Sequence, residues 1–247
     1  MLKSRNFASI LFLLCFTLIA LGAGLGMPIP QTPSDKTNQP QKPNFDRFPI
    51  VNFDAQEPDD LKLRSARRAK GRKYSKRYLP KISESTDQLY STADWDRGLP
   101  AIPAAKSSAI VIGTVNKSEA YLTEDKTTLY SEFRVSVDTV LKNDLGSPID
   151  TERPIIVERN GGRVRMPSGK IIVAWTSHQN MPQVGSRYVL FLTHDFEIKG
   201  DAGKDFYLLT GYLIKDGRVS PLDDTASGRV YNDVTESSFL NDLWSSV

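Results

Sequence analysis

The residues best suited to catalysis or metal binding are two histidines in a chain of 247 residues. A side-chain metal site would need His178, His194 or both together with carboxylates, and neither histidine shows metal-ligand spacing. Ser168, His194 and Asp195 could supply a Ser-His-Asp triad, but the chain has no G-x-S-x-G nucleophile elbow. We therefore expect no catalytic, metal-binding or cofactor-binding residue. A hydrolase that uses the His194 region is kept as an alternative.

The strongest charge pattern is basic and covers residues 62–77, which contain nine Lys and Arg and no acid. A solvated segment is the plainest interpretation. Two alternatives are a contact with an anionic surface and a protease-sensitive segment, because Arg67-Arg68 and Lys76-Arg77 are dibasic. Arg163 and Arg165 are two residues apart on an expected strand, so they project from the same face. The candidate contacts with an anionic partner are Arg67, Arg68, Lys70, Arg72, Lys73, Lys76, Arg77, Arg163 and Arg165.

The net charge of +3 is unevenly distributed. Residues 106–247 hold 16 basic and 19 acidic side chains, so the basic character belongs to the preceding segment. We therefore expect no nucleic acid as a partner of the C-terminal part. The expected partner is an envelope protein or an anionic surface, bound through residues 62–77.

The N-terminus is typical of an export signal. Lys3 and Arg5 precede an apolar stretch over 7–21, and small residues follow. We predict a signal peptide over 1–26, with an uncleaved membrane anchor over 7–27 as the alternative. Cys15 is the only cysteine and lies within this stretch, so a cleaved chain has no thiol for disulfides or catalysis. The predicted location is periplasmic or extracellular, with anchoring to the inner membrane as the alternative.

Residues 27–105 have the composition of a disordered linker. Proline recurs over 28–49, polar residues fill the gaps, and the basic run follows. Such a segment buries too little apolar surface to offset the entropy lost on ordering. Tyr90, Trp95 and Leu99 leave open whether residues 86–105 dock on the following domain.

Residues 106–247 show the pattern of a compact β-domain. Apolar residues run continuously over 108–115, whereas residues 129–141 alternate between apolar and polar side chains. Period-two alternation places Phe133 and its odd-numbered neighbours in the core and the even-numbered residues in water. Further strands are expected over 154–159, 163–166, 170–175, 188–192, 206–214 and 218–219.

Turn and helix signals divide this domain. Asn160-Gly161 and Asp216-Gly217 each predict a β-hairpin, because both central residues of such turns need positive φ. Near the C-terminus the apolar period changes to that of a short helix, with Thr235 or Asp233 as its N-cap. We expect the apolar face of this helix to seal one end of a barrel.

Short antiparallel strands at this spacing predict an all-β fold, and we favour a small OB-like antiparallel barrel with a short C-terminal α-helix. Several strand sequences resemble a group of uncharacterised exported bacterial proteins, which in turn resembles the netrin-like and TIMP-like OB fold. The resemblance lies in residues 108–115, 129–135, 140–143, 161–165 and 184–192. It implies an OB-fold domain and export, and it suggests a peptidase inhibitor or protease-associated module as an alternative function.

The expected function is therefore that of an exported, non-enzymatic binding module or an envelope-associated interaction module. This expectation rests on strand motifs that are mainly structural and on the lack of a recognisable catalytic set in the sequence. TIMP-like inhibitors place an N-terminal cysteine in a metalloprotease, a group that the chain lacks outside Cys15.

Overall fold

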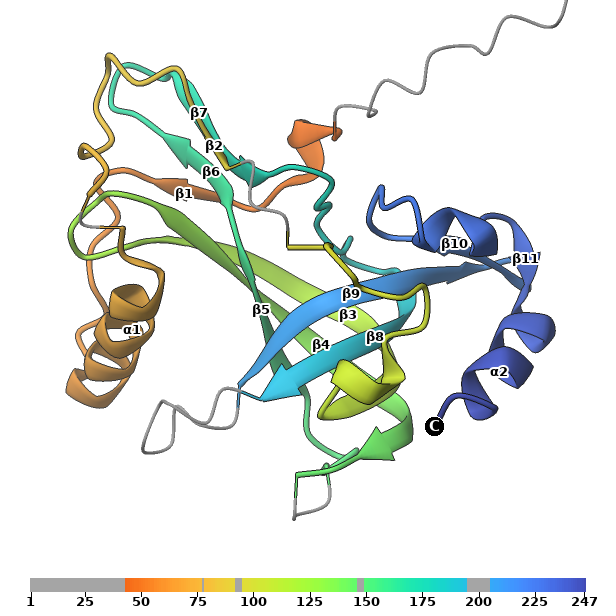
Figure 1. The fold of residues 1–247 in the computed structure, drawn as a ribbon. Coiled ribbons are helices and arrows are strands. Elements are labelled where there is room, and N and C mark those ends of the chain that lie inside the picture. Colours follow the sequence, from red (N-terminus) through yellow and green to blue (C-terminus); the bar gives the residue numbers. More distant parts are fainter. Residues whose placement is uncertain (1–42, 77, 92–94, 146–148, 195–204) are drawn as a thin grey trace, which may run out of the picture. The chain divides into compact units, whose positions relative to one another are not determined.

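The computed structural model describes residues 43–76, 78–91, 95–145, 149–194 and 205–247. All of them belong to the second of the chain's two structural units, Pro40–Val247. Eleven strands and two α-helices form this part of the chain (Figure 1). The helices are α1 (Leu61–Tyr74) and α2 (Glu236–Trp244). The strands are β1 (Ile50–Asn52), β2 (Gln88–Ser91), β3 (Ala109–Leu122), β4 (Leu129–Asn143), β5 (Ile155–Asn160), β6 (Gly162–Arg165), β7 (Ile171–Thr176), β8 (Arg187–His194), β9 (Phe206–Lys215), β10 (Arg218–Pro221) and β11 (Val234–Thr235).

The larger sheet closes a ring of hydrogen bonds. Its order is β11-β10-β9-β5-β4-β3-β8, and β8 pairs again with β9. Around the ring the pairs are antiparallel except β5 and β9, which run parallel. The predicted mostly β fold with a short C-terminal helix is thus confirmed.

Strands β3 and β4 are long because they coil around the ring. Their register shifts at three points, and such bulges increase the local bend and twist. Gly113 lies at one of them, where a Cβ would be 2.5 Å from the Ser136 carbonyl oxygen. Only glycine allows the two backbones to approach this closely.

The core has separate layers on the two faces of the ring. Val111, Phe133, Val157, Leu190 and Leu208, one from each ring strand, belong to the same inner cluster. The alternate residues of β3 and β8 face outward, where they meet the buried side chains of α2. The buried side chains of α2 therefore belong to the outer cluster and not to the inner one, and the Phe239 ring lies 4.6 Å from the Tyr212 ring of β9, contrary to the expectation that the helix seals an end of the barrel.

The cap of α2 agrees with the sequence pattern. The Thr235 side chain accepts a hydrogen bond from the Ser238 amide, as one of the two predicted N-caps requires. Phe239 and Leu243 are fully buried, while Trp244 remains half exposed. The spacing of the two buried residues is that of one helix face.

A second, four-stranded sheet has the order β1-β6-β7-β2. The antiparallel pair β6 and β7 forms its centre, and β1 and β2 add to it in parallel. The predicted Asn160-Gly161 hairpin is wrong, because the chain passes at this point from β5 in the ring to β6 in the other sheet. Gly161 still needs its positive φ of 98°, and a Cβ there would lie 2.5 Å from the Ala174 carbonyl oxygen.

The structure differs from the predicted disordered linker over residues 43–105. This segment contributes β1, α1 and β2, and it buries Phe48, Tyr74, Ile82 and Leu99. The described part of 86–105 also docks, since the Trp95 indole donates to the Ser177 carbonyl at 2.7 Å and Leu99 is buried. The composition of the whole segment is polar, so it gives no sign of the few apolar side chains that are buried. The predicted signal peptide or anchor and the first part of the linker lie outside the described residues.

Candidate functional site

The basic run forms a helix with recognisable ends. Asp60 is the N-cap of α1 and accepts a hydrogen bond from the Leu63 amide at 2.7 Å. Arg72 and Lys73 lie in the last turn, where positive charge complements the helix dipole. Just after the helix, Ser75 contacts the Asp125 carboxylate in the turn between β3 and β4. The basic segment is therefore an ordered helix that buries only Lys70, Gly71 and Tyr74, while its other residues stay at least partly in contact with solvent.

The centre of α1 is anchored by a carboxylate cage around Lys70. We use this name for Glu132 on β4, Glu158 on β5 and Asp205 before β9, which all contact the Lys70 ammonium. The Lys70 Nζ lies 2.6 Å from Glu132 and 3.2 Å from Glu158, and only 7% of the residue is exposed. Tyr74 donates to Glu158 at 2.7 Å. The cage ties the helix to the outer face of two ring strands.

The cage perturbs the acids and the base in it. Burial raises the pKa of Asp205 to about 6. The charge of Lys70 lowers this pKa, and the charges of Glu158 and Glu132 raise it. Burial likewise raises the pKa of Glu132. Burial acts against ionised Lys70, but the charges of Glu132 and Asp205 outweigh it and raise the lysine pKa. Three carboxylates therefore surround a permanently charged ammonium with an excess of negative charge.

The same three carboxylates form the one group among the described residues with a spacing suited to a metal ion, since their oxygens lie within 4.8 Å of one another. Lys70 contacts each of them, so an ammonium already supplies the cation there. This arrangement makes the cage an anchor for α1.

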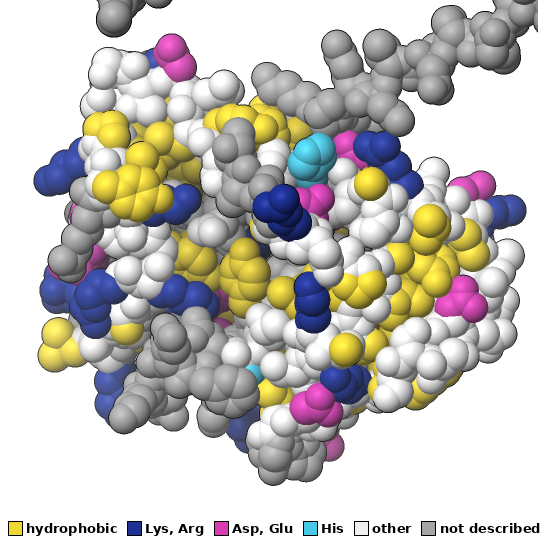
Figure 2. Space-filling model, viewed as in Figure 1, with side chains coloured by type: hydrophobic (Ala, Val, Ile, Leu, Met, Phe, Trp, Pro, Cys, Tyr) yellow, Lys and Arg dark blue, Asp and Glu magenta, His cyan; other side chains and the backbone are white. Residues whose placement is uncertain are grey.

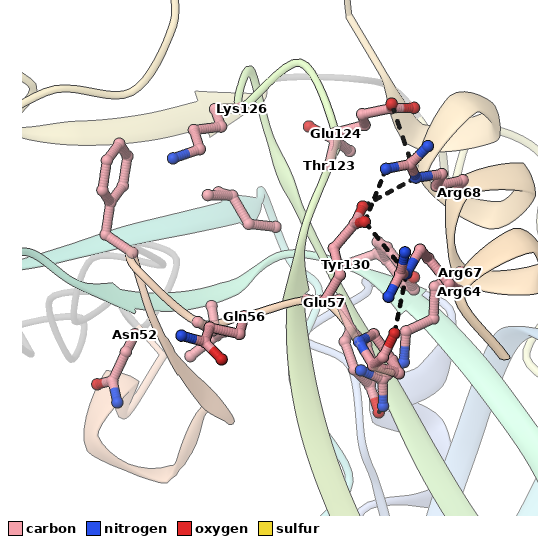
Figure 3. A pocket seen from close by; sticks show the side chains of 16 residues that line it. Asn52, Gln56, Glu57, Arg64, Arg67, Arg68, Thr123, Glu124, Lys126 and Tyr130 are labelled. Carbon is pink, nitrogen blue, oxygen red and sulfur yellow. Dashed lines mark hydrogen bonds and ion pairs between the residues drawn. The ribbon is translucent and has the colours of Figure 1, made fainter. Parts of the chain in front are cut away.

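Two pockets open beside α1. The first, which we call the β1-side pocket, has a volume of about 190 Å³ and lies between α1, β1 and the turn after β3 (Figure 3). The second, the β4-side pocket, has a volume of about 370 Å³ and lies against β3, β4 and β5. Arg67 and Tyr121 line both pockets. The two pockets therefore meet at this pair of side chains.

Arg67 lies over the Tyr121 ring and keeps most of its donors unused. Its guanidinium carbon lies 4.6 Å from the ring centroid, and one nitrogen donates to the Tyr121 hydroxyl at 3.4 Å. Burial followed by the charge of Glu132 raises the pKa of Tyr121, so its hydroxyl stays protonated. A guanidinium has five N–H donors. Within the described residues Arg67 forms no ion pair with a carboxylate.

The other basic residues at the β1-side pocket already have partners. Figure 3 shows the Glu57 carboxylate between Arg68 and Arg64, with nitrogen to oxygen distances of 2.7 Å and 3.6 Å. The ammonium of Lys126 lies 4.0 Å from the centroid of the Phe53 ring. Each pocket is lined by four basic and two acidic side chains.

The structure brings together only part of the predicted anionic contact. Figure 2 shows basic side chains gathered over α1, and Arg67 and Arg68 line the β1-side pocket. Lys70 is enclosed in the cage and does not form part of an open surface. Lys73 is exposed but lies 3.5 Å from Glu158, and its contact with an anionic partner stays a prediction. The remaining candidates are placed as follows: Arg72 is exposed on α1, Lys76 is half buried after it, Arg77 lies outside the described residues, and Arg163 and Arg165 lie on β6.

Arg163 and Arg165 belong to the other sheet and line neither pocket. The Arg163 guanidinium donates to the carbonyl oxygens of Phe48 and Asp46 at 2.9 Å and 2.8 Å. It therefore fixes the segment before β1. Arg165 remains exposed.

The residues of the alternative triad occupy different elements. Ser168 lies in the turn between β6 and β7, and its hydroxyl donates to Glu84 at 2.5 Å. His194 ends β8, with its ring edge-on to Phe206. Asp195 lies outside the described residues. His178 has a positive φ of 62° in a loop, 4.0 Å from the Asp224 carboxylate.

Sequence reasoning missed several residues of the two pockets, above all Tyr121, Lys126 and Arg134. Tyr121 lies on β3 beyond the predicted strand over 108–115, and the two bases come from a turn and an outward-facing strand position. One signal in the sequence points to the docking of α1: residues 106–247 carry more acidic than basic side chains, and this charge complements the nine basic residues of 62–77.

No protein-family model matches this chain, and no curated protein matches it either. Among the residues that the structure describes, no helix has the length and apolar character needed to cross a membrane.

Proposed function

We propose that this chain is an exported, non-enzymatic binding module built on an OB-like barrel, and that it binds an anionic ligand where the two pockets meet at Arg67. The observation that carries the proposal is the state of Arg67. It lies at the junction of two pockets that are both lined by an excess of basic side chains, and its donors are largely unused.

The order of the ring supports the OB-like assignment. Taken in chain order, the ring strands are β3, β4, β5, β8 and β9, a number that matches the five-stranded Greek-key barrel of OB folds. OB folds bind their ligands on the face of the second and third strands and on adjacent loops. In this chain those strands are β4 and β5, and the β4-side pocket includes Arg134 and Ile156 from them.

Several features favour binding over catalysis. Asp205 has the pKa of a potential acid or base, but its carboxylate contacts Lys70 within the cage. Ion-pair networks that hold a structure together perturb pKa values as active sites do. Arg67, by contrast, presents a planar guanidinium whose N–H donors match the geometry of a carboxylate or phosphate, which suits recognition of an anion.

Binding is tested by NMR titration with sodium acetate and sodium phosphate as probes of carboxylate and phosphate. We expect saturable shifts at the Arg67 side-chain Nε–Hε signal and at Tyr121. Arg67→Gln should abolish these shifts, and Arg72→Gln is the matched control, since Arg72 is exposed on the same helix and lines neither pocket. Saturable binding that survives Arg67→Gln, or no binding of either anion, would contradict the proposal.

A further inference from the structure

The charges around the two pockets select a ligand with few negative charges. Arg64, Arg68, Lys70 and Lys117 each form an ion pair with a glutamate of the chain, as at 2.9 Å between Lys117 and Glu119. A polyanion such as nucleic acid needs a row of unpaired cations along its phosphates. Among the described lining residues, Arg67, Lys126 and Arg134 form no ion pair, and of these only Arg67 lines both pockets. A single guanidinium at the junction suits one carboxylate better than a row of phosphates.

The shape of the Arg67 group favours a planar anion. The guanidinium lies over the Tyr121 ring and donates one N–H to the Tyr121 hydroxyl, and its other N–H groups have no partner among the described residues. A carboxylate accepts two parallel N–H bonds from the edge of a guanidinium, and this bidentate contact is both strong and directional.

Apolar side chains lie on both sides of Arg67. The β1-side pocket includes Val51, Phe53 and Leu122, and the β4-side pocket includes Leu63 and Ile156. Leu63 is 47% exposed on the first turn of α1, so part of this apolar surface faces solvent in the free protein. A ligand that places an apolar group in each pocket would cover it.

We propose that the ligand is an acidic peptide segment, in which one Asp or Glu carboxylate binds Arg67 and an apolar side chain on each side enters one of the two pockets. This inference rests on the proposed function. In an extended peptide the residues i and i+2 point to the same side, so the apolar side chains stand two positions before and after the acid. The expected pattern is therefore apolar-x-acidic-x-apolar.

The test uses fluorescence anisotropy with the labelled, end-capped peptide Leu-Ser-Glu-Ser-Leu, which carries a single carboxylate. We expect it to bind at least tenfold more tightly than acetate, because two side chains lose their exposure to water. Replacing the peptide's Glu by Gln should weaken binding about tenfold or more, since a charge-assisted hydrogen bond is lost.

Variants of the protein give an independent test of the pockets. Leu63→Ser should weaken binding of this peptide but leave acetate binding unchanged. Leu61→Ser is the matched control, because Leu61 is 74% exposed on the same turn and lines neither pocket. Both leucines are exposed, so neither change should prevent folding.

The outcomes separate the inference from the proposed function. If acetate and phosphate bind through Arg67 but the peptide binds no more tightly than acetate, the peptide inference is overturned and the anion site remains. Equal losses for Leu63→Ser and Leu61→Ser would also overturn it. If no probe binds, both proposals fail.

Discussion

The excess of negative charge around Lys70 predicts that removing one carboxylate stabilises the protein. Asp205→Asn keeps the size of the side chain and resembles the protonated acid. Burial and the neighbouring carboxylates raise the pKa of Asp205 from 3.8 to about 6. Because one pKa unit corresponds to about 1.4 kcal/mol, ionised Asp205 costs the folded state about 3 kcal/mol relative to the unfolded chain.

The sign of the pH dependence follows from the same shift. Between pH 7 and pH 4 the folded protein takes up a proton at Asp205 before the unfolded chain does, so this contribution to wild-type stability rises as the pH falls. Asp205→Asn lacks that contribution. The variant should exceed wild type by about 3 kcal/mol in free energy of unfolding at pH 7.5, and the difference should approach zero at pH 4.

Urea unfolding at pH 7.5, 6, 5 and 4 measures this difference directly. Asp87→Asn is the control, since it makes the same charge change at a carboxylate that is 93% exposed, and it should alter stability by less than about 0.5 kcal/mol. A destabilised Asp205→Asn variant at pH 7.5, or a difference that does not vary with pH, would refute the description of the cage.

Two further variants probe the ion pairs that hold the chain together. Lys70→Gln removes the cation from the cage and should lower the free energy of unfolding by about 3–5 kcal/mol at pH 7.5. Part of this loss should be recovered at pH 5, because the carboxylates take up protons there. The same urea series measures the loss, and a loss that grows on acidification would contradict the prediction. Arg159 is fully buried and pairs with Asp223 at 2.6 Å, so Asp223→Ala leaves its charge without a carboxylate. This change should also lower the free energy of unfolding by about 3–5 kcal/mol, measured by thermal unfolding. A loss below about 1 kcal/mol would show that the pair contributes little.

The ring strands could be predicted from sequence because their pattern is local. The alternation of Phe133, Val135 and Val137 with polar residues matches their burial in the inner cluster. The Asp216-Gly217 hairpin is also confirmed, with positive φ at both residues. These features depend on neighbours along the chain and on the period of a strand.

The Asn160-Gly161 turn shows where local signals fail. Positive φ at Gly161 is needed, as the sequence predicts, but the same backbone conformation serves a passage between two sheets. Whether the next strand folds back or crosses over depends on β1 and β2, which pair with β6 and β7 from far away in the sequence.

The sequence predicts the kind of ligand at the candidate site, an anion, but not which basic side chains would be available to bind it. A basic segment near an acidic domain suggested an anion contact, and Arg67 and Arg68 are part of the β1-side pocket. Which bases remain available is decided by tertiary partners: Glu132 and Glu158 enclose Lys70, while Arg67 lies over the Tyr121 ring. Such pairings join residues more than 50 positions apart, and no local pattern carries them.

A double-mutant cycle between Arg67→Gln and the Glu-to-Gln change in the peptide Leu-Ser-Glu-Ser-Leu tests the central claim most directly. If the peptide carboxylate contacts the Arg67 guanidinium, the two changes should couple by about 1.5–3 kcal/mol, the range of hydrogen bonds to charged groups. Strictly additive losses would show that the carboxylate binds elsewhere, and they would contradict the assignment of Arg67 as the centre of the site.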